Sequence, residues 1–352
     1  MTTGFGALAA GGLAWSEGDE AVELRGLGDV FAEPTLNPLL ALGPAGWAQA
    51  TDAARVHDGP RGGVQDARMR LPFEVADYVD FYSSREHASN LGRILRPDQE
   101  PLLPNWRWLP IGYHGRAGTV AVSGTEVVRP HGQVKPAEGD PVFGPTNRLD
   151  VELELGFVVG VPSMSGDQVA VEAFADHVFG VVLVNDWSAR DLQAWEYRPL
   201  GPFLGKSFQT SISAWVTPLA LLEPRLVAAP AQEPPPLPYL AGGRDWGLDL
   251  DLELELNGEV VSRTNARGLY WTMPQQLAHV TSNGASLRTG DLMATGAISG
   301  SERGSEGSLI ELWESGRFLA DGDEVVLRGS GGKVELGEVR GRIVSRPSNR
   351  EG

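Results

Sequence analysis

The chain has 352 residues, a formal net charge of −17 and no cysteine, and these totals exclude several classes of function. The negative charge disfavours binding to nucleic acid or anionic membranes, and the lack of thiols excludes disulfides, thiolate metal sites and a cysteine nucleophile. The 45 glycines and 25 prolines predict a mainly β (α+β) fold with many turns. Because the start lacks the features of a signal peptide and no apolar run approaches a membrane span, we expect a cytoplasmic protein.

Residues 1–70 read as short strands with glycine-rich turns around one helical stretch, from Leu36 to Ala50. The expected strands are ALAAGGLAW, AVELRGL, RVHDG and RGGVQ. Because too little of this region is apolar for a large core, we expect a small β-barrel that rests on a second domain, residues 71–352. We find no cluster of catalytic side chains within residues 1–70.

A helix is predicted to begin near Ser84, because Ser83 and Glu86 have the spacing of a capping box. This helix carries His87 in its first turn. Asp80 and Tyr82 precede it on a strand and, being two residues apart, face the same way. A lone histidine usually packs or caps, so an acid/base role for His87 depends on partners from elsewhere in the chain.

The segment LDVELELGFVVGV, residues 149–161, predicts a strand with Glu152 and Glu154 on one face. Such a pair is a weak signal, because DLDLELELNGEV, residues 249–260, alternates in the same way and predicts a strand with one wet, acidic face. The first segment differs in its continuation GFVVGV, which is apolar at both parities. We therefore expect a strand too buried to leave these two carboxylates unpaired.

The stretch from Asn185 to Thr210 holds polar residues in an apolar setting. VFGVVLVNDW predicts a strand buried on both faces, and SARDLQAWEY then predicts a short helix that ends before Pro199. At helical spacing, one narrow stripe contains Asp186, Arg190, Gln193 and Tyr197, and Lys206 follows after a turn. The stripe on its own favours a solvated face with an i,i+4 Asp/Arg pair.

Two later segments complete the prediction. Thr272 as N-cap, Pro274 in the first turn and Gly284 past the end predict one more helix, while SGDQVAVEAFADHVFG predicts an amphipathic helix before the buried strand. Glu311 lies in the apolar run SLIELW, where a carboxylate needs a partner.

Four segments together resemble the fumarylacetoacetase family, the hydrolases at the end of tyrosine degradation. They are DYVDFYSSREHASN, LLPNWRWLPIGYHGRAGTVAVSG, LDVELELGF and VNDWSARDLQAWEYRPLGPFLGKSF, and the resemblance runs from about residue 31 to the C-terminus. It implies an N-terminal β-barrel of SH3 type, a large C-terminal mixed β-sandwich roll and a homodimer. It also implies a small-molecule substrate, a β-diketo acid, while the negative charge already argues for no nucleic acid and no membrane as partner.

The resemblance implies a divalent cation, Ca²⁺ or Mg²⁺. Its ligands would be Asp80, Glu152, Glu154 and Asp186, with Lys206 and Thr210 beside them. Four carboxylates without thiols suit a hard cation that prefers oxygen ligands. Taken with Glu311, these carboxylates exceed the positive charges of Arg96, Arg190 and Lys206 by two, which a divalent ion neutralises.

The catalytic roles come from the same resemblance. His87 would activate the attacking water, and Glu311 would orient His87. The groups that would stabilise the oxyanion are Arg190, Gln193 and Lys206. The remaining substrate contacts would be Tyr82, Arg96, Tyr113 and Tyr197, and Ala297 stands where the family has a substrate-contacting threonine.

The implied reaction is metal-dependent hydrolysis of the carbon–carbon bond of 4-fumarylacetoacetate to fumarate and acetoacetate. Two alternatives remain at this stage. One is another enzyme of the same superfamily, such as an acylpyruvase, a β-keto acid decarboxylase or a diene-dioate isomerase. The other is a non-catalytic binding module stabilised by a cation.

Overall fold

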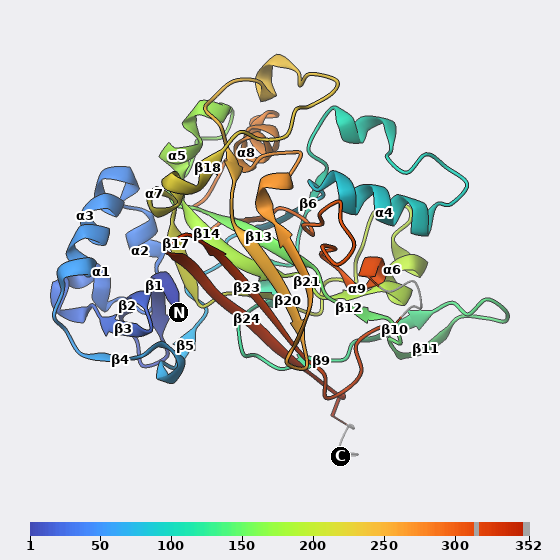
Figure 1. Ribbon diagram of the computed structural model, residues 1–352, viewed down its shortest axis with the longest axis horizontal. Helices are drawn as coiled ribbons and strands as arrows, with labels where there is room; N and C mark the ends of the chain where they lie inside the picture. The colour runs from blue at the N-terminus through green and yellow to red at the C-terminus, as the bar shows by residue number, and fades with distance from the viewer. Residues whose placement is uncertain (313–316, 348–352) are drawn as a thin grey trace.

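The computed structural model describes residues 1–312 and 317–347 and shows a mainly β protein surrounded by short helices (Figure 1). Its largest sheet has 13 strands. The path of neighbours is β4 (Arg61–Gly63), β3 (Glu20–Glu23), β2 (Leu13–Gly18), β1 (Thr2–Leu8), β17 (Trp215–Pro218), β14 (Val178–Asn185), β13 (Leu153–Val159), β22 (Leu292–Ala294), β6 (Tyr78–Phe81) and β7 (Gly112–His114). Off this path, β5 (Met69–Arg70) pairs with β1, β16 (Thr210–Ile212) pairs with β14, and β8 (Val120–Val122) pairs with β16.

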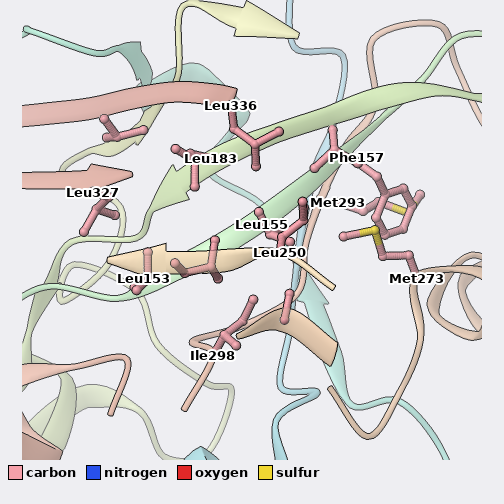
Figure 2. Packing of buried hydrophobic residues seen from close by; sticks show 14 of the residues in the cluster. Leu153, Leu155, Phe157, Leu183, Leu250, Met273, Met293, Ile298, Leu327 and Leu336 are labelled. Carbon is pink, nitrogen blue, oxygen red and sulfur yellow. The ribbon is translucent and has the colours of Figure 1, made fainter. Parts of the chain in front are cut away.

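A second sheet, of five strands, packs over the middle of the first and makes the main core. Its order is β21 (Glu259–Asn265), β20 (Asp251–Leu256), β23 (Glu324–Gly331), β24 (Val334–Val344) and β9 (Val127–Val128). Leu155 and Leu183 of the large sheet belong to one buried cluster with Leu250, Leu327 and Leu336 (Figure 2). Most pairings are antiparallel, but β6–β22, β8–β16 and β9–β24 are parallel, so the sheets are mixed.

Strand β14 is buried along its whole length, as the sequence predicts. Val181 and Leu183 contribute to the core between the two sheets, whereas Phe179 and Val182 lie in a second cluster with Phe5 and other N-terminal residues. The opposite case is also confirmed, because β20 alternates between buried leucines and partly or fully exposed acidic residues. The two acidic strands therefore differ in burial as expected.

The N-terminal strands extend the large sheet instead of closing on themselves. Within residues 1–70 the pairing is an open path from β4 to β1, where Phe5 of β1 pairs with Val216 of β17 and Leu8 pairs with Met69 of β5. No closed barrel is found there, so the expected SH3-like barrel is not confirmed. RVHDG was wrong as a strand, because its first residues end a long helix, α3.

The described helices are short, apart from α3 and α4. They are α1 (Asp29–Ala32), α2 (Asn37–Leu40), α3 (Gly43–Val56), α4 (Arg85–Leu95), α5 (Phe174–His177), α6 (Arg190–Glu196), α7 (Leu219–Leu222), α8 (Met273–Thr281) and α9 (Leu309–Leu312). The predicted helix after Thr272 is confirmed with its cap, whereas the amphipathic helix before β14 reduces to a 3-10 turn and the four residues of α5. Among these helices, none is long and apolar enough to cross a bilayer.

The two-stranded sheets include a hairpin that extends from the body of the molecule, formed by β10 (His131–Val134) and β11 (Val142–Pro145) (Figure 1). The others pair β12 (Leu149–Asp150) with β15 (Ser188–Ala189), and β18 (Leu226–Val227) with β19 (Gly247–Leu248). The β12–β15 pair lies directly before β13 and α6 in the chain, and these two elements carry Glu154, Arg190 and Gln193 of the predicted site.

Candidate active site

Three carboxylates from neighbouring strands meet in the protein interior. Asp80 lies on β6, Glu154 on β13 and Asp186 directly after β14. The strands are adjacent because β14 pairs with β13, β13 with β22, and β22 with β6. One oxygen from each carboxylate lies within 4.8 Å of the others, and all three residues are buried. Carboxylates so close together repel one another in a low-dielectric interior unless protons or a cation neutralise them.

Two of these carboxylates show the effect of that repulsion. Burial, together with the charge of Asp186, raises the pKa of Asp80 to about 7. Burial and the charge of Asp80 hold the pKa of Glu154 well above its usual range. Asp80 Oδ1 and Glu154 Oε1 are buried with no hydrogen-bond partner. These free oxygens and the all-oxygen donor set fit a hard divalent cation such as Ca²⁺ or Mg²⁺.

The backbone of Gly296 binds one of the two carboxylate oxygens of Glu154. Its backbone N–H donates to Glu154 Oε2 over 3.1 Å, and the backbone has a φ of +77°. A Cβ built there would lie 2.2 Å from the carbonyl oxygen of Phe81, so only glycine fits without displacing β6. The contact leaves Oε1 as the unpaired oxygen of Glu154.

Lys206 joins Asp186 to the fourth predicted ligand, Glu152. Its Nζ lies 2.6 Å from Asp186 Oδ2 and also donates to Glu152 Oε2. Thr210 Oγ1 donates to Asp186 Oδ1 over 2.7 Å. Burial alone would raise the pKa of Glu152, but Lys206 and Arg190 hold it below the usual range. The structure thus groups Asp80, Glu154 and Asp186 closely and places Glu152 beside them, paired with cations.

A histidine–glutamate pair lies on the other side of Glu152. His87 Nδ1 is 2.6 Å from Glu311 Oε2, and His87 Nε2 is 3.9 Å from Glu152 Oε1. Burial would lower the pKa of His87, but the Glu311 carboxylate outweighs it and the net shift is upward. Since Glu311 accepts from Nδ1–H, the lone pair of the neutral ring is on Nε2, which faces the acidic cluster. This is the partner that the sequence left open for both residues.

Local structure fixes both members of this pair. The side chain of Ser84 caps α4 by accepting from the backbone N–H of His87 over 3.3 Å, so the cap is Ser84 and the predicted Ser83 was one residue early. Glu311 on α9 accepts further hydrogen bonds from Asn90, Ser299 and Ser308, at 3.0, 3.0 and 2.6 Å. With four donors around it, Glu311 has its pKa lowered despite its burial.

The predicted helical stripe is corrected at its first residue. Helix α6 begins at Arg190 after the two residues of β15, so Asp186 lies off the helix and does not pair with Arg190. Instead Arg190 donates from Nε to Asp150 Oδ2 over 2.7 Å and forms an ion pair of 2.8 Å with Glu152. Gln193, one turn along, accepts from Arg190 Nη1 over 3.2 Å. Arg190 is therefore a buried member of the site, not part of a solvated face.

Comparison with known proteins places the chain in a family. The family "Fumarylacetoacetate (FAA) hydrolase C-terminal" matches residues 77–344. Fumarylacetoacetases are 43% identical in Caenorhabditis elegans, over 92% of this chain and 86% of that protein, and 43% identical in Homo sapiens, over 90% and 84%. The chain belongs to the fumarylacetoacetase family. This membership confirms the resemblance seen in the four sequence segments.

Solved structures extend the likeness to the fold. A fumarylacetoacetate hydrolase from Exiguobacterium antarcticum aligns with a TM-score of 0.66 at 16% identity, over 98% of this chain and 100% of that chain. A maleylpyruvate hydrolase from Sphingobium aligns with a TM-score of 0.62 at 19% identity, over 98% and 100%. At these identities the comparison shows a shared fold and carries no conclusion about the substrate.

Three of the substrate-contacting residues implied by the family resemblance, Tyr82, Tyr113 and Arg96, lie next to His87, to Asp80 or to each other. The Tyr82 ring lies edge-on to His87, 5.4 Å between ring centres, and Tyr113 Oη donates to Asp80 Oδ2 over 2.8 Å. Arg96 ends α4, donates to the carbonyl of Pro101 over 3.2 Å, and has a buried Nε without a partner. Its charge opposes the upward shift that burial imposes on the pKa of Tyr82.

Tyr197 and Ala297 are less directly connected. Tyr197 is half-buried at the end of α6, where the guanidinium of Arg198 lies 5.1 Å from its ring. Ala297 is buried, next to Gly296. Among the described residues, no hydrogen bond joins either of them to the carboxylate cluster.

Two residues that contact the site were missed in the sequence, Arg116 and Asp150. Arg116 forms ion pairs with both Asp80 and Asp186, at 2.9 and 2.8 Å. Asp150 accepts from Arg190 and, over 2.8 Å, from the backbone N–H of Leu309 at the start of α9. Arg116 lies in the quoted segment GYHGRAG, but nothing in a loop sequence separates a buried arginine from an exposed one.

These two additions leave the net charge of the cluster unchanged. Apart from Glu311, which pairs with His87, and Arg96, which is outside the cluster's ion pairs, five carboxylates face three cations, a formal excess of two negative charges. The carboxylates are Asp80, Asp150, Glu152, Glu154 and Asp186, and the cations are Arg116, Arg190 and Lys206. One divalent ion balances this excess.

Proposed function

We propose that this chain is a fumarylacetoacetase, which hydrolyses 4-fumarylacetoacetate to fumarate and acetoacetate. The observation that carries the proposal is the convergence of the His87–Glu311 pair, two buried cations and a carboxylate trio on one interior site. The identity of about 43% to fumarylacetoacetases over 90% of the chain supports the same substrate.

The metal would be held by Asp80, Glu152, Glu154 and Asp186. Its ligands and their unpaired oxygens favour Ca²⁺ or Mg²⁺. When bound, such an ion polarises carbonyl oxygens of the substrate and stabilises the negative charge of the departing acetoacetate fragment. Lys206 and Thr210 hold the Asp186 carboxylate in place for that role.

His87 acts as the general base. Its Nε2 accepts a proton from water while Nδ1–H remains bonded to Glu311, whose negative charge stabilises the imidazolium. The hydroxide adds to the carbonyl carbon next to the fumaroyl double bond. The bond from that carbon to the adjacent methylene then breaks and its electron pair remains on the acetoacetate fragment. The proton that His87 took from water is transferred to this carbon and completes the methyl group, which returns the ring to its neutral form.

The oxyanion formed in this addition needs positive donors. Arg190, Gln193 and Lys206 fill that role in the proposal, and two of them are already fixed by buried carboxylates. Losing one such donor typically lowers kcat by about 10² to 10³. Contacts to the two ends of the substrate are assigned to Tyr82, Arg96, Tyr113, Tyr197 and Ala297.

A panel of substrates tests the proposal. The loss of absorbance of fumarylacetoacetate should be rapid, while acylpyruvates and β-keto acids should react at least about 10²-fold more slowly, because their shorter acyl groups leave polar contacts unused. A preference for an acylpyruvate would favour another enzyme of the superfamily. No turnover of any of these compounds would favour a cation-stabilised binding module.

The assembly, domain boundary and location belong to the same proposal. A homodimer is supported by large apolar side chains that are exposed, namely Phe143 on β11 at 71%, and Leu200 at 97% and Phe203 at 67% in the segment after α6. Light scattering after gel filtration tests the dimer, and a monomer would contradict it.

We keep the domain boundary between residues 1–70 and 71–352, and a cytoplasmic location, as parts of the proposal.

A further inference from the structure

Arg116 is a buried arginine on the loop between β7 and β8 that takes no part in the chemistry assigned to His87. Its backbone is left-handed, with a φ of +75°, which is uncommon for a residue other than glycine. Its carbonyl accepts hydrogen bonds from the backbone N–H and the hydroxyl of Thr119, at 3.0 and 3.1 Å. The side chain is only 6% exposed, so its charge has to be balanced inside the protein.

The guanidinium spans two of the three clustered carboxylates. Nη1 donates to both oxygens of Asp186, at 2.8 and 2.9 Å, and Nη2 donates to Asp80 Oδ2 over 2.9 Å. Because guanidinium is planar and rigid, two of its nitrogens fix the separation of the groups that they bind. Asp80 lies on β6 and Asp186 directly follows β14, and these two strands are not adjacent, so this contact links two separate parts of the sheet.

Two tyrosines hold the guanidinium where it is. Its central carbon lies 4.8 Å from the centre of the Tyr78 ring and 5.0 Å from that of Tyr113. Tyr113 also donates to Asp80 Oδ2, so that oxygen accepts two hydrogen bonds while Oδ1 accepts none. This asymmetry fixes the rotation of the Asp80 carboxylate and leaves Oδ1 free to bind a cation.

Lys206 does not duplicate this arrangement. It pairs with Asp186 and Glu152, and within residues 1–312 and 317–347 Arg116 is the one cation that pairs with Asp80. Without Arg116, Asp80 would retain the hydrogen bond from Tyr113 but would lose its connection to Asp186.

We propose that Arg116 is a positioning residue for the divalent cation, whose guanidinium sets the separation of Asp80 and Asp186 and leaves Asp80 Oδ1 free as a ligand. The inference rests on the metal site of the proposed function. A guanidinium that instead stood in the place of the ion would compete with it. Positioning and competition predict changes of opposite sign in metal affinity, so the sign decides between them.

Isothermal titration calorimetry with CaCl₂ and with MgCl₂ makes the test, on the wild-type protein, Arg116→Met and Arg116→Lys. Arg116→Met is expected to bind the ion about 10- to 100-fold more weakly, which is the usual effect of removing a group that orients metal ligands. Arg116→Lys should also bind more weakly, because an ammonium does not present two nitrogens at the fixed, planar spacing with which the guanidinium contacts Asp80 and Asp186. The matched control is Arg225→Met, which removes a partly buried arginine paired with Asp249 and should leave affinity unchanged.

A kinetic readout separates positioning from a role in catalysis. Raising the metal concentration until the site is filled should restore the kcat of Arg116→Met to near the wild-type value. Metal affinity equal to or tighter than wild type in either Arg116 variant would overturn the inference. If Arg116→Met does not fold, Arg116→Lys decides alone. A wild-type protein that binds neither ion would refute the metal site of the proposed function, and this inference with it, whereas normal binding in all the variants would refute only the role of Arg116.

Discussion

Replacing Glu311 by glutamine should disable His87 through its tautomer. Asn90 Nδ2 donates to Glu311 Oε1, and the oxygen of that same amide accepts from Arg93 Nη1 over 2.9 Å, which fixes its orientation. In Glu311→Gln the side-chain oxygen therefore has to face Asn90, and the new NH₂ group has to face His87 Nδ1. The ring then accepts at Nδ1 and carries its proton on Nε2, so it is unable to take one from water.

The size of the effect follows from related triads. Changing the aspartate of a Ser-His-Asp triad to asparagine lowers kcat by about 10⁴, or about 5 kcal/mol in transition-state stabilisation, through the same tautomer error. We expect a comparable loss in kcat with little change in KM, because Glu311 is one residue removed from the substrate. The pH dependence of kcat/KM provides a second test. Glu311 raises the pKa of His87, so the rise of kcat/KM with pH should move to lower pH in the variant.

The assay is the absorbance loss of fumarylacetoacetate, measured for wild type, Glu311→Gln and the double variant with Asn90→Ala. Removing the Asn90 donor frees the glutamine to turn its oxygen toward His87, so the double variant should be faster than Glu311→Gln by about tenfold. A Glu311→Gln enzyme within about threefold of wild type would refute the tautomer argument, as would a double variant slower than the single one.

Three further outcomes are expected from the same geometry. His87→Ala should abolish turnover and leave calcium binding intact by calorimetry, because its ring is not among the carboxylate ligands; near-normal turnover would remove His87 as the base. Asp186→Asn should weaken cation binding severely, since it removes a ligand charge next to Lys206 and Arg116, and unchanged affinity would contradict the metal assignment. The stabilisation of the fold by calcium should grow as pH rises from about 4 to about 7. With its pKa raised to about 7, Asp80 binds a proton more tightly in the metal-free folded state than in the unfolded state. The metal-free protein therefore loses stability as pH rises through this range, whereas bound calcium replaces the proton. Thermal unfolding with and without EDTA measures it, and a calcium effect independent of pH would count against the cluster.

The sequence was most informative where burial could be read from periodicity. The apolar run before Asn185 predicted the doubly buried β14, and GFVVGV distinguished buried Glu154 from the wet carboxylates of β20. Family resemblance then brought His87 and Glu311 together. No local pattern connects two residues 224 positions apart, and only the fold places them 2.6 Å from each other.

The errors have a common physical cause. Asp186 fits a helical stripe by spacing, but β15 pairs with β12 and delays the helix, so the chain follows tertiary pairing over local periodicity. Arg116 was missed because its importance comes from two strands that are distant in sequence. The N-terminal strands likewise use β17 as a neighbour, a pairing that composition does not reveal.

Removing the metal tests the central claim most directly. The purified protein, stripped by exhaustive EDTA treatment and passed into metal-free buffer, should turn over fumarylacetoacetate at less than about 1% of its original rate, since a carbon leaving group needs its charge stabilised. Adding Ca²⁺ or Mg²⁺ should restore the rate in proportion to the occupancy measured by calorimetry. An undiminished rate in the stripped protein would contradict the claim that Asp80, Glu154 and Asp186 serve to hold a catalytic cation.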